Sequence, residues 1–352
     1  MDEPWMLYGA YGYPGRLIAQ EAARRHLTPV LAGRSQGKVA SLANELGLEA
    51  RVFGLVDEAQ VVAGLKGMKL VLHCAGPFSA TSRPMISACL QAGTHYLDIT
   101  GEIDALEHAY QQQSAARAAG IVICPGVGFD VIPTDCVAAT LKTALPDATR
   151  LALGFHSGSG LSPGTAKTLV ESLTKGGRIR KDGKIIAVPL AHSTRSIDFG
   201  EGGEKLAMTF PWGDVSTAFY TTGIPNIEVY ITGSRVLITG ARNANLIHWL
   251  LRLGLAQTFL KGTIEKTLKG PSRENREASP SYVWGEVSNE QGQVKTARIK
   301  TANGYSLTVT GALAVVEHLL RIQVQGGTYT PATLVGPNLV VRLPGSGPLR
   351  VE

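Results

Sequence analysis

The sequence predicts an α/β fold: a Rossmann-type, doubly wound parallel sheet followed by a second α+β domain with a mixed sheet. Two observations predict it. Over the first 126 residues, six short apolar runs alternate with helical patterns, which is typical of a parallel sheet covered on both faces. After Asp135, strand-like runs instead alternate with glycine-rich turns, which indicates a domain of different architecture.

The first domain is expected to alternate strictly between strands and helices. Its expected strands are Trp5–Tyr8, Pro29–Ala32, Arg51–Leu55, Leu70–Ala75, Tyr96–Ile99 and Ile121–Pro125. The helices expected between them are Arg16–His26, Gln36–Leu46, Glu58–Leu65, Pro84–Ala92 and Ile103–Ala119. Pro84 is assigned to the first turn of its helix, where the missing N–H is tolerated.

The second domain is expected to hold several short strands, a hairpin and two long helices. The expected strands are Leu151–Phe155, Ile185–Val188, Ala207–Phe210, Glu228–Thr232, Tyr282–Val287, Val294–Thr301 and Tyr305–Thr310, with helices at Asn245–Leu268 and Gly311–Gln323. Asp182-Gly183 is a hairpin turn signal. The expected domains are residues 1–130, 131–310 and 311–352, the last returning to the Rossmann domain.

Three glycines after the first expected strand predict a dinucleotide-binding turn. Gly9, Gly12 and Gly15 are spaced G-x-x-G-x-x-G and lie between Trp5–Tyr8 and a helical segment. Backbone N–H groups and the positive end of a helix dipole bind pyrophosphate at such a turn. A plain glycine turn is the alternative interpretation, because the spacing is one residue longer than G-x-G-x-x-G.

The residues after the second expected strand favour NADP(H) over NAD(H). Arg34 occupies the position where an acidic residue binds the ribose 2′-hydroxyl of NAD, and an arginine there accommodates a 2′-phosphate. Lys38 follows one helical turn later, and no acidic residue occurs before Glu45. A solvated loop arginine is the alternative.

Further cofactor contacts are expected at the ends of the strands, because ligands of this fold bind outside the carboxyl edge of the sheet. Tyr11, Tyr13 and Pro14 belong to the glycine turn and are expected to pack on the cofactor. Ala75, Gly76, Pro77 and Phe78 follow the fourth strand, and Phe78 is expected near the nicotinamide. Gly126, Gly128 and Phe129 follow the sixth strand, where glycines allow close approach of the ring.

Three residues are candidates for proton transfer. Asp98 and Glu102 flank a turn after the fifth strand, and two neighbouring carboxyl groups can raise one another's pKa. Alternatively, Glu102 caps the helix that begins near Ile103. His156 follows another strand and titrates near neutral pH, although a structural role is the alternative. Asp130 is expected to be structural, with Asp135 in the first turn of a helix.

Composition excludes several classes of protein. A net charge of +6 over 352 residues suits anionic ligands but is too diffuse to indicate nucleic-acid binding. No apolar run is long enough for a membrane span. The four cysteines form no C-x-x-C pair, so we expect reduced, buried thiols and no metal site. An acidic start, Met1-Asp2-Glu3, does not resemble a signal peptide, and a cytoplasmic location is expected.

Several segments in order resemble the saccharopine dehydrogenase-like oxidoreductases, which include the trans-acting enoyl reductases of bacterial lipid synthesis. The segments are Gly9–Gly15, Ala75–Phe78, Tyr96–Glu102 (YLDITGE), Pro125–Asp135 (PGVGFDVIPTD), Gly158–Thr165, Pro211–Asp214, Thr222–Asn226 and Gly326–Ala332. The resemblance implies an NADP(H)-dependent oxidoreductase with a Rossmann domain and a mixed-sheet substrate domain. It leaves the substrate open.

The specific expectation is reduction of a C=C bond conjugated to a carbonyl, on a small acyl or lipid-like molecule. The apolar segment 246–260 would line an oily site, or alternatively form a core or a homodimer seam. Two further functions remain as alternatives: a saccharopine-type imine reductase acting on an amino acid, and a non-catalytic NADP(H)-binding protein. An imine reductase needs arginines for carboxylates, for which Arg178, Arg180, Lys181 and Arg195 are candidates.

Overall fold

A computed structural model describes residues 3–157, 176–245 and 279–352 of the chain. By packing, the chain divides into two units: residues 1–130 with 305–335, and residues 131–304 with 336–352. The expected C-terminal segment thus contributes to both units, because residues 336–352 pack with the second one. No helix within the described ranges has the length and apolarity that crossing a bilayer requires.

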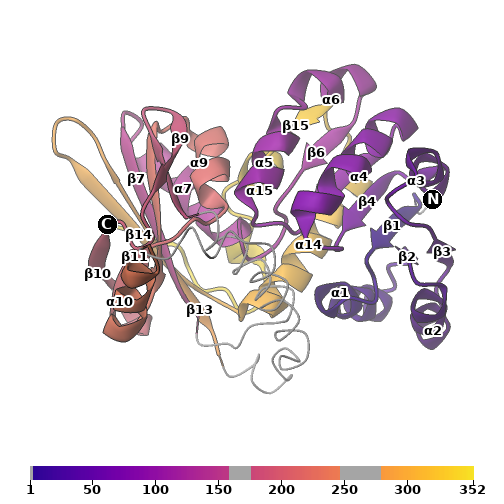
Figure 1. The fold of residues 1–352 in the computed structure, drawn as a ribbon, viewed down its shortest axis with the longest axis horizontal. Coiled ribbons are helices and arrows are strands. Elements are labelled where there is room, and N and C mark those ends of the chain that lie inside the picture. Colours follow the sequence, from indigo (N-terminus) through magenta and orange to yellow (C-terminus); the bar gives the residue numbers. More distant parts are fainter. Residues whose placement is uncertain (1–2, 158–175, 246–278) are drawn as a thin grey trace. The chain divides into compact units, whose positions relative to one another are not determined.

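The first unit contains a parallel sheet with the strand order β15-β6-β5-β4-β1-β2-β3 (Figure 1). Its strands are β1 Trp5–Tyr8, β2 Val30–Gly33, β3 Ala50–Val52, β4 Leu70–His73, β5 His95–Asp98, β6 Val122–Cys124 and β15 Gly327–Thr328. The order reverses between β1 and β4, as in a doubly wound dinucleotide-binding sheet. The six strands expected in this unit are confirmed, and β15 is a seventh.

Helices cover both faces of this sheet (Figure 1). They are α1 Tyr13–Arg24, α2 Gln36–Leu46, α3 Glu58–Leu65, α4 Phe78–Ala92, α5 Ile103–Tyr110, α6 Gln113–Ala119, α14 Gly304–Arg321 and α15 Pro331–Val335. One core lies beneath α3, α4 and α6 and includes the buried residues Met6, Val71, Met85, Ile86, Tyr96 and Ile123. The alternation of apolar strand and amphipathic helix is therefore what builds the first core.

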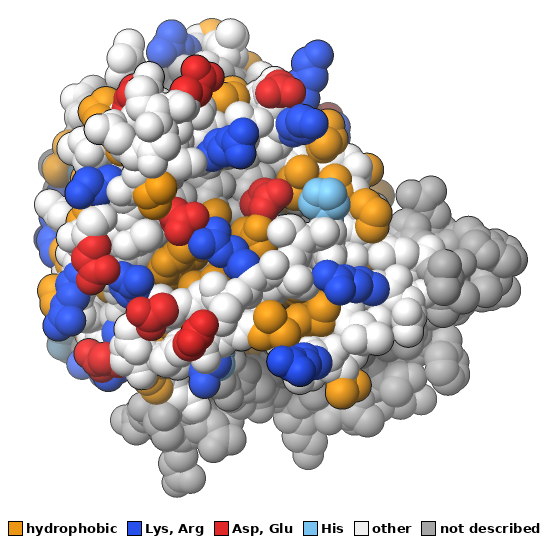
Figure 2. All heavy atoms as spheres, turned by 90° about the vertical axis from the view of Figure 1, so that its left-hand side faces the viewer, with side chains coloured by type: hydrophobic (Ala, Val, Ile, Leu, Met, Phe, Trp, Pro, Cys, Tyr) orange, Lys and Arg blue, Asp and Glu red, His pale blue; other side chains and the backbone are white. Residues whose placement is uncertain are grey.

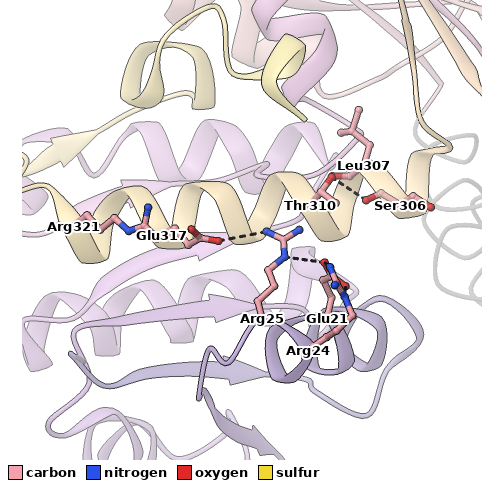
Figure 3. Close-up of polar contacts among 8 residues, drawn as sticks. All are labelled: Glu21, Arg24, Arg25, Ser306, Leu307, Thr310, Glu317 and Arg321. Carbon is pink, nitrogen blue, oxygen red and sulfur yellow. Dashed lines mark hydrogen bonds and ion pairs between the residues drawn. The ribbon is translucent and has the colours of Figure 1, made fainter. Parts of the chain in front are cut away.

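Helix α14 joins the first unit although it lies far along the sequence. Arg25 at the end of α1 donates to Glu21 Oε1 at 2.8 Å and pairs with Glu317 Oε1 of α14 at 3.4 Å (Figure 3). The expected strand Tyr305–Thr310 is wrong, because this segment is the first part of α14. The hydroxyl of Thr310 bonds back to the carbonyl of Ser306 at 3.1 Å, so a strand-like composition is accommodated within a helix.

Two other expected helices differ from the structure. Helix α4 begins at Phe78 rather than at Pro84, which lies in its interior. The helix can begin earlier because its first two N–H groups, those of Phe78 and Ser79, bind the Glu102 carboxylate. The single helix expected at 103–119 is two, α5 and α6, which separate at Gln111 and Gln112.

The second unit contains a mixed sheet, ordered β10-β11-β12-β7-β13-β14-β16 in its described part, with β8 paired to β12 and β9. The strands are β7 Arg150–Ser157, β8 Gly177–Lys181, β9 Lys184–Val188, β10 Thr194–Asp198, β11 Glu204–Thr209, β12 Asn226–Thr232, β13 Ser281–Ser288, β14 Val294–Thr301 and β16 Arg350–Val351. Among the described strands of this sheet, β12 and β7 are parallel and the other pairs are antiparallel. The expected α+β mixed sheet is confirmed, as is the β8–β9 hairpin, whose turn residues Asp182 and Gly183 have positive φ.

Helices of the second unit are α7 Ile132–Ala144, α9 Asp214–Thr222 and α10 Arg235–Ala244, with 3₁₀ turns η1 Gly200–Gly202 and η3 Val340–Arg342. Pro133 and Asp135 lie in the first turn of α7, as expected. Helices α7 and α9 are joined by two hydrogen-bonded pairs, the buried pair Thr134 to Asp214 at 2.6 Å and the partly buried pair Thr221 to Asp135. The helix expected at Asn245–Leu268 lies outside the described residues, apart from Asn245.

Charges of both signs are interspersed on the face shown in Figure 2, with hydrophobic side chains between them. Several ion pairs link neighbouring segments of the second unit's sheet: Arg195 to Glu286 at 3.0 Å, Arg298 to Glu352 at 2.6 Å and Lys300 to Glu201 at 2.8 Å. The four cysteines are buried and form no disulfide among the described residues. A group of residues suited to hold a metal ion is likewise not found in the described ranges.

Gly285 offers a test of the second unit's packing. A Cβ at this position of β13 would lie 2.6 Å from Val137 Cγ1 and 2.8 Å from Leu141 Cδ1 of α7. We expect Gly285→Ala to destabilise the protein by about 1–3 kcal/mol through overpacking. Gly37→Ala is the control, because its Cβ meets no atom within 4 Å and alanine favours a helix. Urea denaturation measures both, and equal stability of the two variants would contradict the packing.

Candidate functional site

The turn between β1 and α1 depends on glycines that allow backbone segments to approach closely. Gly9 has φ +80°, and a Cβ there would lie 2.7 Å from Ala75 N. A Cβ on Gly15 would lie 2.3 Å from the carbonyl oxygen of Gly9. The N–H groups of Gly9 and Ala10 both donate to the carbonyl of Ala32 on β2. The turn is therefore tied to β2 and packed against the residues that follow β4, with no room for a side chain at Gly9 or Gly15.

The N-terminus of α1 carries no acidic side chain in its first turn. Its N-cap is Gly12, which provides no side-chain hydrogen bond. Pro14 occupies the first turn, where a proline favours helical backbone geometry. A helix N-terminus without an acidic residue in its first turn suits a phosphate, because the positive end of the dipole attracts an anion.

Two cations lie beside this turn at the end of β2. Arg34 and Lys38 are exposed, and neither forms an ion pair within the described chain. Gly33 makes room for the ring of Tyr11, since a Cβ on Gly33 would lie 2.7 Å from Tyr11 Cε1. Lys38 Nζ lies 5.7 Å from the centroid of the same ring. Tyr11 thus rests on β2 next to Lys38, at the side of the turn that the sequence predicts for the adenosine ribose.

Tyr13 and Phe78, both expected to contact the cofactor, also have neighbours within the protein. The Tyr13 ring meets Tyr305 of α14 edge-on at 5.1 Å. Phe78 is buried, and its ring meets His73 edge-on at 5.4 Å. By contrast, Gly76 and Pro77 are exposed at the end of β4, so this short segment offers backbone surface to a ligand.

Glu102 caps a helix other than the one expected. Its Oε1 accepts from Phe78 N at 2.9 Å and its Oε2 accepts from Ser79 N at 2.7 Å, both in the first turn of α4. It makes no side-chain cap for its own helix, α5. The carboxylate is almost fully buried. The geometry therefore favours a capping role over proton transfer for Glu102.

Asp98 lies at the carboxyl edge of the first unit's sheet, and both oxygens of its carboxylate accept hydrogen bonds. Its Oδ2 accepts from the Tyr96 hydroxyl at 2.6 Å, and its Oδ1 accepts from Thr100 N at 2.9 Å and Gly126 N at 2.8 Å. The side chain is 1% exposed. Burial raises its pKa to about 6, while these hydrogen bonds act in the opposite direction. The residue therefore remains mostly ionised at pH 7.5.

The loop after β6 is held on two sides. Gly126 has φ +75°, and the N–H of Val127 donates to the Asp98 carbonyl at 2.7 Å. On the other side, Phe129 N donates to Thr308 Oγ1 of α14 at 3.0 Å, and a Cβ on Gly128 would lie 3.2 Å from Thr308 Cγ2. Contact with α14 was not foreseen, because nothing near Gly128 in the sequence indicates it.

Asp130 ends this loop and packs against the turn after β5. A Cβ on Gly101 would lie 2.9 Å from Asp130 Oδ2, so glycine at 101 makes room for the carboxyl group. Burial raises the pKa of Asp130 to about 7. The sequence indicates only a structural role for this residue, and the structure adds an unusual titration to it.

His73 is a buried polar residue at the carboxyl edge that the sequence analysis missed. It ends β4 with no exposed surface, and its Nε2 lies 3.0 Å from Thr81 Oγ1. Because the Thr81 hydroxyl donates to the Ala75 carbonyl at 2.7 Å, the proton of the imidazole belongs on Nε2. Burial lowers the pKa of His73 to about 3. The signal in the sequence was a lone histidine within an apolar strand.

His156 belongs to the second unit. Its Nδ1 lies 2.9 Å from Thr232 Oγ1, and its ring stacks on Tyr282 at 6.2 Å. Burial, followed by the charge of Lys205, lowers its pKa, which favours the neutral imidazole. Asp98 and Glu102 thus lie together at the edge of the first sheet, whereas His156 has its own partners on β12 and β13. The segments 158–165 and 246–260 lie outside the described residues.

The first unit is similar to domains of a known family. Residues 5–124 match the saccharopine dehydrogenase NADP binding domain. A mouse saccharopine dehydrogenase-like oxidoreductase is 33% identical over 37% of this chain and 35% of its own length. A trans-acting enoyl reductase of Mycobacterium ulcerans is 36% identical over 37% of this chain and 33% of its own length.

Two comparisons extend over nearly the whole chain. A trans-acting enoyl reductase of Mycobacterium bovis is 24% identical over 97% of this chain and 96% of its own length. The solved structure of the apo saccharopine dehydrogenase (L-Glu forming) of Saccharomyces cerevisiae covers 99% of both chains with a TM-score of 0.67 and 11% identity. At that identity the likeness concerns the fold.

The lowered pKa of His73 predicts a loss of stability in acid. A histidine whose pKa is lower in the folded state binds its proton more readily when unfolded, so stability falls as the pH drops below 6.5. Between pH 7 and pH 5 we expect this group to cost about 2 kcal/mol. Asp98, whose pKa is raised, acts in the opposite direction, so the parent must be compared with His73→Gln. In urea titrations the variant should lose about 2 kcal/mol less than the parent, and equal losses would contradict the prediction.

Proposed function

We propose that this chain, whose residues 5–124 match the saccharopine dehydrogenase NADP binding domain, is an oxidoreductase that transfers hydride from NADPH to an unsaturated carbon of its substrate. The specific substrate class is a C=C bond conjugated to a carbonyl, on an acyl or lipid-like molecule. The observation that carries the proposal is similarity over almost the entire chain to a protein named trans-acting enoyl reductase.

The first unit holds candidate binding residues for each part of the cofactor. The open N-terminus of α1 would bind the pyrophosphate, and Arg34 with Lys38 would bind the 2′-phosphate. The exposed segment Gly76–Pro77 and the loop Gly126–Phe129 lie at the carboxyl ends of β4 and β6, where this fold binds the nicotinamide half. When bound, the nicotinamide supplies the hydride. The protein's own contribution is to fix the position of the ring and to exclude water.

A saccharopine-type imine reductase is the second candidate, and the second unit argues against it. Recognition of an amino-acid substrate requires arginines that are available to carboxylates. Arg180 is 4% exposed and donates to the carbonyls of Val215 and Gly183, while its guanidinium lies 4.2 Å from the Phe219 ring centroid. Arg195 makes two 3.0 Å bonds to Glu286. Two of the four cations considered for this role are therefore engaged within the protein.

Turnover assays distinguish the three functions. Oxidation of NADPH is followed by absorbance with an α,β-unsaturated acyl thioester, and separately with an α-keto acid plus an amino acid. Turnover with the thioester supports the proposal, and turnover only with the second mixture supports the imine reductase. Binding of NADPH without turnover in either mixture favours the third candidate, a non-catalytic NADP(H)-binding protein.

The position of Arg34 predicts the preference for the cofactor. A charge-assisted contact with the 2′-phosphate contributes roughly 1.5–3 kcal/mol, which corresponds to about ten- to a hundredfold in affinity. We therefore expect NADPH to bind more tightly than NADH, and Arg34→Ala to weaken NADPH by about that factor while leaving NADH nearly unchanged. Fluorescence titration measures the four affinities.

Arg24→Ala is the matched control, because Arg24 is an exposed arginine of the same unit whose partner is Glu21 on its own helix. Equal affinity of the unmutated protein for NADPH and NADH would overturn the assignment of Arg34. An equal effect of the two substitutions would show a general charge effect instead.

A further inference from the structure

Asp98 connects the end of β5 to two separate loops through one side chain and one carbonyl. Its Oδ1 is shared by Thr100 N in the turn after β5 and by Gly126 N in the loop after β6. Its main-chain oxygen accepts from Val127 N. Two successive N–H groups of the loop 126–129 therefore bind the same residue, and Gly126 has a positive φ.

The loop is fixed from α14 as well. Thr308 Oγ1 accepts from Phe129 N at 3.0 Å, and Gly128 leaves room for the Thr308 methyl group. Three N–H groups of the four-residue loop 126–129 are thus hydrogen-bonded. Their acceptors are the side chain and the carbonyl of Asp98 and the side chain of Thr308. Backbone clamped in this way keeps its shape before a ligand arrives, which lowers the cost of binding.

We propose that Asp98 is a positioning residue, which holds the loop Gly126–Phe129 in the conformation that receives the nicotinamide half of NADPH and takes no part in proton transfer. The inference rests on the function proposed above, because it assigns a task within that same cofactor site. It also changes the role of Asp98 from the acid that the sequence suggested.

The bonding of Asp98 explains why it is not the proton donor. Both carboxylate oxygens already accept hydrogen bonds, and the side chain is 1% exposed. To donate a proton, the group would have to release Tyr96 or the loop that it holds. Asparagine can reproduce the arrangement, since its amide oxygen accepts from Thr100 and Gly126 and its NH₂ group donates to the Tyr96 oxygen.

The test compares Asp98→Ala, Asp98→Asn and a control at the opposite end of the same strand. Thr94 precedes β5, is buried, and donates to the Met68 carbonyl at 3.0 Å. Thr94→Ala therefore removes a buried hydrogen bond from the amino edge of the sheet and leaves the carboxyl edge intact. Each variant is measured for NADPH affinity by fluorescence, for amide exchange at 126 and 127 by NMR, and for kcat and KM.

We expect Asp98→Ala to weaken NADPH binding about tenfold or more and to accelerate exchange at Gly126 and Val127, since these buried donors lose their acceptor or its support. Asp98→Asn and Thr94→Ala should bind NADPH within about threefold of the parent, and Asp98→Asn should keep kcat within the same factor. If Asp98→Ala does not fold, the kcat of Asp98→Asn alone decides whether Asp98 is a positioning residue or an acid.

Two results would overturn the proposal. One is an Asp98→Asn variant with normal NADPH affinity and protected amides but a kcat reduced a hundredfold, because this would identify an acid. The other is unchanged exchange and affinity in a folded Asp98→Ala variant. Should the parent reduce no unsaturated substrate, the proposed reaction fails, while the exchange and affinity measurements still decide the role of Asp98.

Discussion

The close approach of backbone segments at the β1–α1 turn is the constraint on which the rest of the first unit depends. A side chain at Gly15 would collide with the Gly9 carbonyl, and one at Gly9 would collide with the residues that follow β4. Only without these side chains can the chain turn tightly enough for α1 to begin directly after β1. The dinucleotide site that we propose rests on three features: the N-terminus of α1, the neighbouring Arg34 and the order of the strands.

Internal carboxylates decide which helix ends remain open to a ligand. Glu102 occupies the first two N–H groups of α4, whereas α1 has neither a capping side chain nor an acidic residue in its first turn. Of these two helix ends, only that of α1 can therefore attract a phosphate. Asp98, at the same edge of the sheet, has a different role, because its carboxylate accepts hydrogen bonds from backbone N–H groups of the nearby loops.

Local sequence patterns were sufficient for most of the first unit and for the glycine turn. They failed where tertiary contacts override local preference: Tyr305–Thr310 has a strand-like composition, yet it forms the start of α14. They also could not show that Glu102 caps α4 or that Thr308 binds Phe129, which lies 179 residues away. The periodicity of apolar residues indicates which face of a segment is buried. Hydrogen bonds from a side chain to a distant backbone group depend instead on how segments that are far apart in the sequence pack together.

The last strand of the first sheet arrives late during synthesis. Strand β15, only Gly327 and Thr328, pairs with β6, and Gln113 Oε1 accepts from both the N–H and the hydroxyl of Thr328. At ordinary rates of translation, β6 waits roughly 10–40 s for this partner after residue 130 has been made. During that interval its open edge can pair with another chain. Gly327 and Thr328 thus cover the edge of a sheet whose other strands were made about two hundred residues earlier, and a chain that stops before Gly327 leaves the edge of β6 without this partner.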